Sequence, residues 1–249
     1  MTEGAYMTDD VKTAVIIGAS SGIGEALARQ LHKEGWSLGL LARREERLAA
    51  IAAELRDRVS TAYIDVSLDD CSRKLEALLA VLGGADLVII SAGTGHLNPQ
   101  HDIFLDQETT AVNVYGFMAI TEAVFRHFQQ RGRGHLAAIT SVAALRGSAD
   151  ATAYAASKAF QSVYLDGLRD SARHKKLSIT ITELQAGFVD TNMMKTGTPL
   201  PPLVRRLLVS DATTAARQML RAILRKQKHA YITRRYVLIA WLLRLLPRP

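Results

Sequence analysis

Short apolar runs alternate with longer stretches of helical composition along most of the chain. The apolar runs predict strands at 13–17, 37–41, 62–66, 86–90, 136–141, 178–184 and 230–233. The stretches between them predict helices at 25–34, 44–56, 68–82, 104–130, 152–174, 212–226 and 236–246. Strands that alternate with helices of this length imply parallel strands joined by right-handed crossovers, with helices on both faces of the sheet. The pattern therefore predicts an α/β fold, a doubly wound parallel sheet in three α/β/α layers.

The same pattern sets the domain boundaries. Residues 1–11 are polar and lack the basic and apolar regions of a signal peptide, so we expect a flexible lead-in. Residues 12–235 carry the alternating pattern without a repeat or a linker, which predicts a single domain. Residues 236–249 are basic and apolar and are expected to form a C-terminal helix.

Composition adds a constraint through the distribution of charge. The chain of 249 residues has a formal net charge of +7, but 212–249 contains nine basic and no acidic side chains. The rest of the chain is therefore close to neutral, which argues against a nucleic-acid-binding domain. The single cysteine, Cys71, allows no intramolecular disulfide and fits a reducing compartment, so we expect a cytoplasmic protein. The histidines lack the spacing of metal ligands, and no metal site is expected.

A glycine-rich loop stands between the first predicted strand and the first predicted helix. Glycine permits a tight turn and lets a pyrophosphate approach the backbone, while the helix N-terminus supplies N–H groups and partial positive charge. Glycines also collect in ordinary turns, but the position of this loop favours a Rossmann-like nucleotide site. Its candidate contacts are Gly18, Ser20, Ser21, Gly22, Ile23 and Gly24.

The end of the second predicted strand indicates which nucleotide binds. An NAD site usually places a carboxylate there to bind the ribose hydroxyl groups, whereas this chain has Arg43 and Arg44. An arginine fork suits the 2′-phosphate of NADP, so NADP is favoured over NAD. The alternative is that both arginines only solvate the start of a helix.

Tyr154 and Lys158 lie four residues apart in the predicted helix 152–174, which places a phenol and an ammonium on one face. A nearby cation favours the phenolate, so we expect Lys158 to bring the pKa of Tyr154 toward the working pH. Ser141 ends the preceding strand and can donate a hydrogen bond to a substrate oxygen.

Together these motifs resemble those of the short-chain dehydrogenase/reductase family over roughly residues 12–192. The resemblance implies a catalytic tetrad of Asn113, Ser141, Tyr154 and Lys158. It also implies further cofactor contacts from Asp65, Val66, Ala92, Gly93, Gly187, Val189 and Thr191, besides Tyr154 and Lys158 themselves.

The roles implied by the resemblance describe hydride transfer between nicotinamide and a carbonyl or secondary alcohol. Tyr154 would exchange the proton with the substrate oxygen, and Ser141 would polarise that oxygen. Lys158 would lower the pKa of Tyr154 and hold the nicotinamide ribose, while Asn113 would hold a water in a proton relay. The alternative is a non-catalytic NADP-binding sensor or scaffold of the same fold, which the complete tetrad argues against.

The chain departs from the family pattern at three positions: Ile17 replaces a threonine, Ser91 an asparagine and Ala186 a proline. Ile17 and Ser91 stand at positions that support the central loops, Ala186 stands in the loop that enters the cofactor site, and none of the three belongs to the tetrad. The family's substrate lid corresponds to 188–210. The apolar residues of this lid are Met193, Met194, Leu200, Leu203 and Val204. They either line the site of a lipophilic substrate or only pack against one another within the lid.

Two partner surfaces are expected. Family members associate through helices that correspond to 104–130 and 152–174, which implies a homodimer or homotetramer. The C-terminal segment 236–246 is too short to cross a bilayer. It either packs on the protein or on a partner subunit, or lies on the inner face of a membrane through its apolar and basic residues.

Overall fold

The computed structural model describes residues 11–191, 201–233 and 235–245. Seven parallel strands form one sheet in the order β3-β2-β1-β4-β5-β6-β9. Their bounds are β1 Thr13–Ile17, β2 Ser37–Ala42, β3 Val59–Tyr63, β4 Leu87–Ile90, β5 Arg133–Ser141, β6 Ser178–Ala186 and β9 His229–Ile232. The predicted doubly wound fold is thus confirmed as a single three-layer domain.

Helices cover both faces of the sheet, because each face of its central strands is apolar. One face packs against α1 (Gly22–Lys33), α2 (Glu45–Leu55) and α9 (Ala212–Leu224). The other packs against α3 (Cys71–Val81), α5 (Phe117–Arg131) and α6 (Thr152–His174). Separate apolar clusters fill the two interfaces, so the core lies on either side of the sheet.

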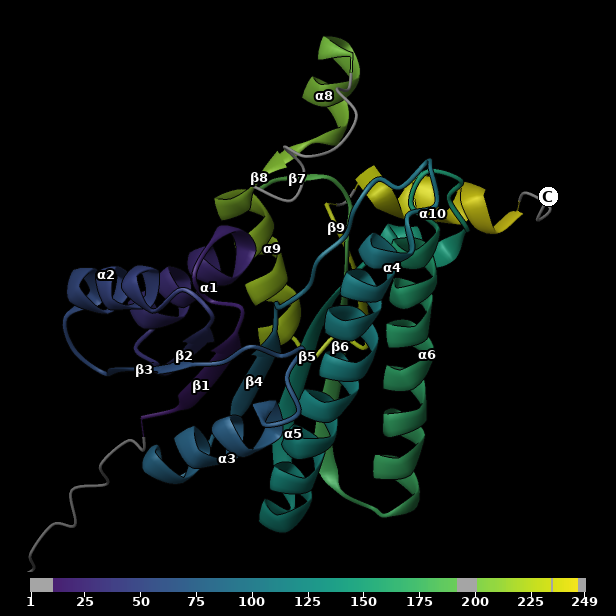
Figure 1. Ribbon diagram of the computed structural model, residues 1–249. Helices are drawn as coiled ribbons and strands as arrows, with labels where there is room; N and C mark the ends of the chain where they lie inside the picture. Colours follow the sequence, from purple (N-terminus) through teal and green to yellow (C-terminus); the bar gives the residue numbers. More distant parts are fainter. Residues whose placement is uncertain (1–10, 192–200, 234, 246–249) are drawn as a thin grey trace, which may run out of the picture.

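The remaining elements lie near the carboxyl ends of the strands (Figure 1). They are α4 (Ile103–Thr110), the π-helical segment η1 (Ala111–Gly116), the 3-10 turn η2 (Val142–Leu145), the paired short strands β7 (Val189–Asp190) and β8 (Ser210–Asp211), α8 (Pro202–Leu208) and α10 (Arg235–Leu245). The predicted lid is described only at its ends, and 192–200 lie outside the described residues. No helix in the described part of the chain is long and apolar enough to span a membrane.

The third strand differs from the prediction. The apolar residues in 62–66 predicted a strand there, but β3 runs from Val59 to Tyr63. Val59 pairs with Leu38, and Tyr63 with Ala42, at the outer edge of the sheet. Pairing with β2 sets where this edge strand begins and ends. The side chains of β3 are partly exposed, so their sequence pattern does not mark these limits. Asp65 and Val66 consequently lie in the loop after the strand.

The predicted helix at 104–130 is interrupted. It is divided into α4, η1 and α5, and Asn113 lies inside the π-helical segment. The backbone carbonyl of Asn113 accepts a hydrogen bond of 2.9 Å from the side-chain amide of Gln161 on α6. A carbonyl engaged from outside the helix is consistent with a local change of backbone pattern, and π-helical turns often occur at functional sites.

Candidate active site

The residues singled out from the sequence lie at the carboxyl edge of the sheet. From β1 the chain builds outward through β2 and β3, then returns to place β4 on the other side of β1. In a doubly wound sheet this reversal of strand order creates a crevice where ligands bind. The glycine loop follows β1, and Ser141 ends β5 on the same edge.

The glycine loop is packed too closely for larger residues. Gly18 has φ of +89°, and a Cβ atom there would lie 2.6 Å from the backbone nitrogen of Ala92. A Cβ on Gly24 would lie 2.3 Å from the carbonyl oxygen of Gly18, and one on Gly22 3.1 Å from Thr191. Helix α1 begins at once, and its N-cap residue, Ser21, makes no side-chain capping bond. This arrangement of backbone and helix N-terminus fits a pyrophosphate.

The two arginines after β2 take different positions. Arg44 donates to the hydroxyl of Ser20, at 3.0 Å from one terminal nitrogen, and to that of Ser21 at 2.6 Å. Arg44 therefore holds the glycine loop. The Arg43 side chain is 63% exposed, and its nearest acidic partner is Asp65 at 3.9 Å. Arg43 is thus the freer cation at the position expected to recognise the cofactor ribose.

Asp65 and Val66 border the same crevice from the loop after β3. Burial opposes ionisation of Asp65, but hydrogen bonds from Ser67 and the charge of Arg43 hold its pKa below the usual range. The carbonyl of Val66 packs against the π-helical segment, because a Cβ on Gly116 would lie 2.3 Å from that oxygen.

The four residues of the proposed tetrad converge around the start of α6. Tyr154 and Ser141 share a hydrogen bond between their side chains. The Lys158 Nζ lies 5.6 Å from the centre of the Tyr154 ring and donates to Gln161 Oε1 at 3.0 Å. Gln161 in turn donates to the carbonyl of Asn113, so hydrogen bonds connect Lys158 to Asn113.

Asn113 is anchored by the loop that follows β4. Its side-chain amide donates to the Thr94 carbonyl at 2.7 Å and to Ser157 Oγ at 3.0 Å. The Thr94 N–H returns a bond of 3.0 Å to the Asn113 side-chain oxygen. Ala92 and Gly93 belong to this loop, and a Cβ on Gly93 would lie 3.4 Å from Lys158 Nζ.

Burial governs the protonation of the central pair. Lys158 is 4% exposed, and desolvation lowers its pKa to about 8. Burial raises the pKa of Tyr154, and the hydrogen bond to Ser141 only partly offsets this. Lys158 is not among the groups that shift the pKa of Tyr154 in the protein alone, so the lowering of that pKa by Lys158 stays a prediction.

The start of the segment after β6 borders the crevice. Ala186 ends β6 beside Ser141, and Gly187 follows with its N–H donating to the Ile232 carbonyl. Val189 is buried in the short strand β7. Thr191 reaches the glycine loop at Gly22. Thr191 thus lies beside the glycine loop, and Gly187 directly follows the residue that pairs with Ser141.

Several residues in these networks were not predicted from the sequence. Gln161 links Lys158 to Asn113, and its spacing of three residues from Lys158 on one helix could have indicated this. Thr94 had no recognisable signal, because its role depends on a loop that approaches Asn113 from another part of the chain. The same holds for Tyr236 of α10, whose ring packs against Gly187.

Comparison with known proteins identifies relatives for both the sequence and the fold. Residues 12–199 match the family model described as short chain dehydrogenase. An uncharacterized oxidoreductase of Myxococcus xanthus is 34% identical over 200 residues, covering 78% of this chain and 78% of that protein.

Solved structures agree with this family match. The alcohol dehydrogenase of Thermococcus sibiricus complexed with 5-hydroxy-NADP superposes with a TM-score of 0.77 at 26% identity, covering 90% of this chain and 96% of the other. A short chain dehydrogenase/reductase of Burkholderia phymatum in complex with NAD gives 0.81 at 22% identity, covering 94% and 92%. The second comparison speaks to the fold alone.

Proposed function

This chain belongs to the short-chain dehydrogenase/reductase family and is a dehydrogenase or reductase with a nicotinamide cofactor, and from that premise we propose its chemistry. It exchanges a hydride between NADP(H) and a carbonyl or secondary alcohol of a lipophilic substrate. The observation that carries this proposal is the set of contacts around Tyr154, which shares a hydrogen bond with Ser141 while Lys158 lies over its ring.

In the reductive direction Tyr154 gives its phenolic proton to the carbonyl oxygen as negative charge develops there. Ser141 donates a hydrogen bond to the same oxygen and stabilises that charge. The nicotinamide, when bound, supplies the hydride or accepts it in the reverse reaction. The phenolate left on Tyr154 is stabilised by the buried ammonium of Lys158, whose Nζ lies 5.6 Å from the ring centre.

Lys158 and Asn113 have supporting roles in this proposal. Lys158 also holds the nicotinamide ribose, and Asn113 holds a water through which Tyr154 regains its proton. The hydrogen bonds from Lys158 through Gln161 to Asn113 support this relay, because they keep the two groups at a fixed separation. Gln161 is therefore a positioning residue for the tetrad.

NADP is the proposed cofactor. The glycine loop and the start of α1 hold its pyrophosphate, with Ala92, Gly93, Gly187, Val189 and Thr191 bordering the rest. Arg43 binds the 2′-phosphate, because Arg44 is held by Ser20 and Ser21 whereas the exposed Arg43 side chain has its acidic partner, Asp65, at 3.9 Å. Asp65 and Val66 border the adenine side.

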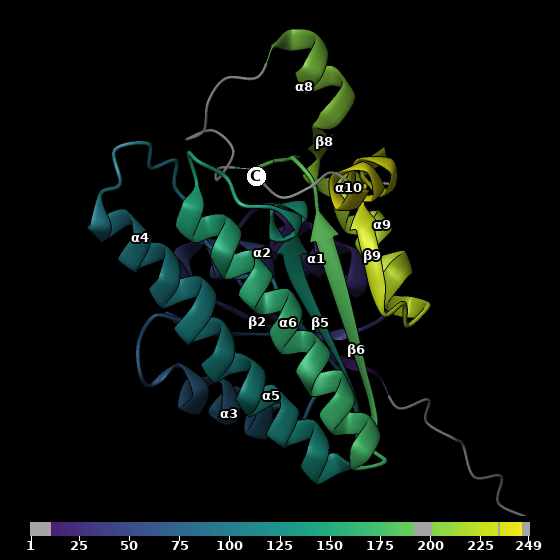
Figure 2. The same cartoon turned by 90° about the vertical axis from the view of Figure 1, so that its right-hand side faces the viewer.

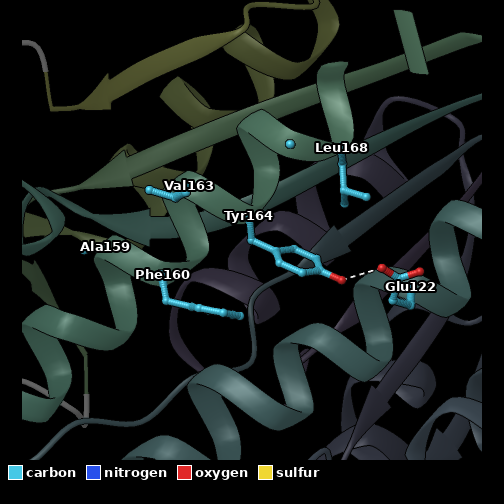
Figure 3. Close-up of a pocket in the computed structure, with 7 residues that line it drawn as sticks. Glu122, Ala159, Phe160, Val163, Tyr164 and Leu168 are labelled. Carbon is cyan, nitrogen blue, oxygen red and sulfur yellow. Dashed lines mark hydrogen bonds between the residues drawn. The ribbon is translucent and has the colours of Figure 1, made fainter. Parts of the chain in front are cut away.

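A homodimer through α5 and α6 is the proposed assembly. These helices enclose an apolar groove of about 600 Å³ lined by Phe160, Val163, Tyr164 and Leu168, with Glu122 at its edge (Figure 3). Phe160 stacks on Tyr164, and Tyr164 donates a hydrogen bond to Glu122. Val163 is 72% exposed although it lies beside these apolar groups. An exposed apolar groove of this kind is typical of a subunit interface.

The test of the chemistry is Tyr154→Phe, assayed with NADPH against a panel of aldehydes and ketones. We expect turnover to fall by roughly 10²- to 10⁴-fold, while NADPH binding, followed by nicotinamide fluorescence, is unchanged. Tyr63→Phe on β3 is the matched control and keeps full turnover. Wild-type rates in Tyr154→Phe would refute the proton-transfer role. NADPH binding without turnover of any carbonyl by the unmodified protein would favour the sensor.

A further inference from the structure

Helix α10 presents an uncovered apolar face. Tyr236 and Ala240 are 3% and 1% exposed and attach the helix to the body of the protein. On the opposite side Val237, Leu238, Trp241 and Leu242 are 52%, 62%, 57% and 47% exposed. Their spacing places all four on one side of an α-helix. We call these four residues the outer face of α10.

The outer face adjoins the end of the molecule that carries the active site. Helix α10 packs against η2, the turn that directly follows Ser141. Figure 2 shows β6 pointing toward α10, and Figure 1 shows the helix beyond the carboxyl ends of the central strands. A surface bound by α10 would therefore lie near the end of the molecule that carries Ser141 and Tyr154.

The segment that carries the outer face has charges of a single sign. Residues 233–249 contain Arg234, Arg235, Arg244 and Arg248 and no acidic residue. Arg235 is exposed at the start of the helix and donates to Thr233. An apolar face carried by a basic segment matches a surface that is both apolar and anionic. A second copy seated on this face would bring like charges together, which opposes that occupant.

We propose that the outer face of α10 docks on the surface of an anionic phospholipid bilayer. The helix of 11 residues is about 16 Å long, about half of the roughly 30 Å hydrocarbon thickness, so it lies along the surface. Trp241 is the expected interfacial anchor, since indole favours the boundary between headgroups and chains. Resting on the proposed function, docking would deliver a lipophilic carbonyl compound from the bilayer to the active site.

Vesicle flotation of the full-length protein with NADPH tests the proposal. The two vesicle types are phosphatidylcholine alone and phosphatidylcholine mixed with phosphatidylglycerol. We expect recovery to be roughly tenfold higher with the anionic vesicles, and to fall at high salt. In Trp36→Phe, Trp241 is the remaining tryptophan, and its emission should shift to the blue only with anionic vesicles.

The decisive variant combines Leu238→Gln and Trp241→Gln, which change exposed side chains and should leave the fold intact. Flotation should be lost in this double variant and kept in Val81→Gln, a control whose side chain is 78% exposed on α3. The proposal would be overturned if the double variant were recovered as well as the unmodified protein, or if the unmodified protein were recovered equally with neutral and anionic vesicles. A double variant that still floats with both vesicle types, but whose mass is half that of the unmodified protein, would assign the face to a second copy and would also overturn the proposal.

Turnover of a water-soluble carbonyl, measured without vesicles, separates this proposal from the proposed function. The double variant should keep that turnover, because none of its changed residues touches the tetrad. If the unmodified protein turns over the carbonyl but does not float with anionic vesicles, docking is refuted and the proposed function stands. Flotation that persists while Tyr154→Phe keeps full turnover would refute the proton-transfer role alone.

Discussion

The ring of Tyr236 occupies the space that a side chain at Gly187 would fill. A Cβ on Gly187 would lie 2.0 Å from Cε2 of this ring. The Tyr236 hydroxyl accepts from the Phe188 N–H and donates to the Leu208 carbonyl, both at 3.0 Å. One side chain of α10 thereby connects the beginning of the predicted lid to its end. The glycine is required here by close packing.

Gly187→Ala should destabilise the protein by about 1–3 kcal/mol, because the new methyl group overlaps the Tyr236 ring. Tyr236→Phe keeps the ring but removes both hydrogen bonds, which should cost about 1 kcal/mol and raise KM for NADPH more than it changes kcat. When Gly187→Ala is combined with Tyr236→Ala the overlap disappears. The effects of these two substitutions on the free energy of unfolding, measured singly and together, should therefore be non-additive. Additive effects in urea denaturation would show that the contact is unimportant.

Arg43 and Arg44 should separate recognition of the 2′-phosphate from support of the loop. Arg43→Ala should raise KM for NADPH by roughly 10- to 100-fold, the loss of a charge-assisted contact, and leave KM for NADH nearly unchanged. Arg44→Ala should raise KM for both cofactors, because Arg44 holds Ser20 and Ser21. Arg47→Ala, which changes an exposed arginine on α2, the helix that follows them, is the control. Preferential NADH binding that Arg43→Ala does not alter would contradict the NADP assignment.

Lys158 should make stability depend on pH. Its pKa of about 8 lies below the value of 10.5 for an unburied lysine. Below pH 8 the ammonium is charged in the folded and the unfolded chain, and its full burial cost is present. As pH rises from about 8 toward 10.5 the folded chain loses this proton first, so the cost is relieved and stability increases.

Comparison with Lys158→Met isolates this effect, because other titrating groups contribute equally to both proteins. The free energy of unfolding of the unmodified protein should gain roughly 1.4 kcal/mol per pH unit relative to the variant above pH 8. Urea denaturation on either side of pH 8 measures it. A difference that stays constant across this range would mean that Lys158 is not desolvated.

Val163→Arg should dissociate the proposed dimer, since it places a charge in an apolar groove that the second subunit would cover. Sedimentation should give the mass of one chain for this variant and of two or more for the unmodified protein. Val81→Arg changes a similarly exposed valine on α3 and should leave the mass unchanged. An unaltered mass in Val163→Arg would exclude α6 from the interface.

Elements with a strong local pattern were predicted closely. The helix expected at 152–174 is α6, Thr152–His174, and the strand expected at 13–17 is β1. The pattern was weaker for β3, an edge strand whose extent depends on its neighbour. Helix α8 was not predicted, because the segment 187–210 is rich in prolines and follows no apolar period.

The candidate site shows the same division. Motif spacing together with position in the order of strands and helices selected Gly18, Tyr154 and Lys158, because each needs a particular residue at a particular place in a strand–loop–helix unit. The interaction of Lys158 with Gln161, and of Arg44 with the loop serines, depends on side-chain orientation. The burial that lowers the pKa of Lys158, and the choice of Arg44 as the arginine that holds the loop, likewise depend on packing.

The sequence by itself determined the doubly wound fold, the family and the candidate chemistry, since periodicity and motif order are local properties of the chain. Only the tertiary structure decided that Asn113 lies in a π-helical turn held by Gln161 and Thr94. It alone brought Tyr236 against Gly187, from 49 positions away in the chain. Both contacts join segments that are distant in sequence, and close packing between them leaves no periodic trace in either segment.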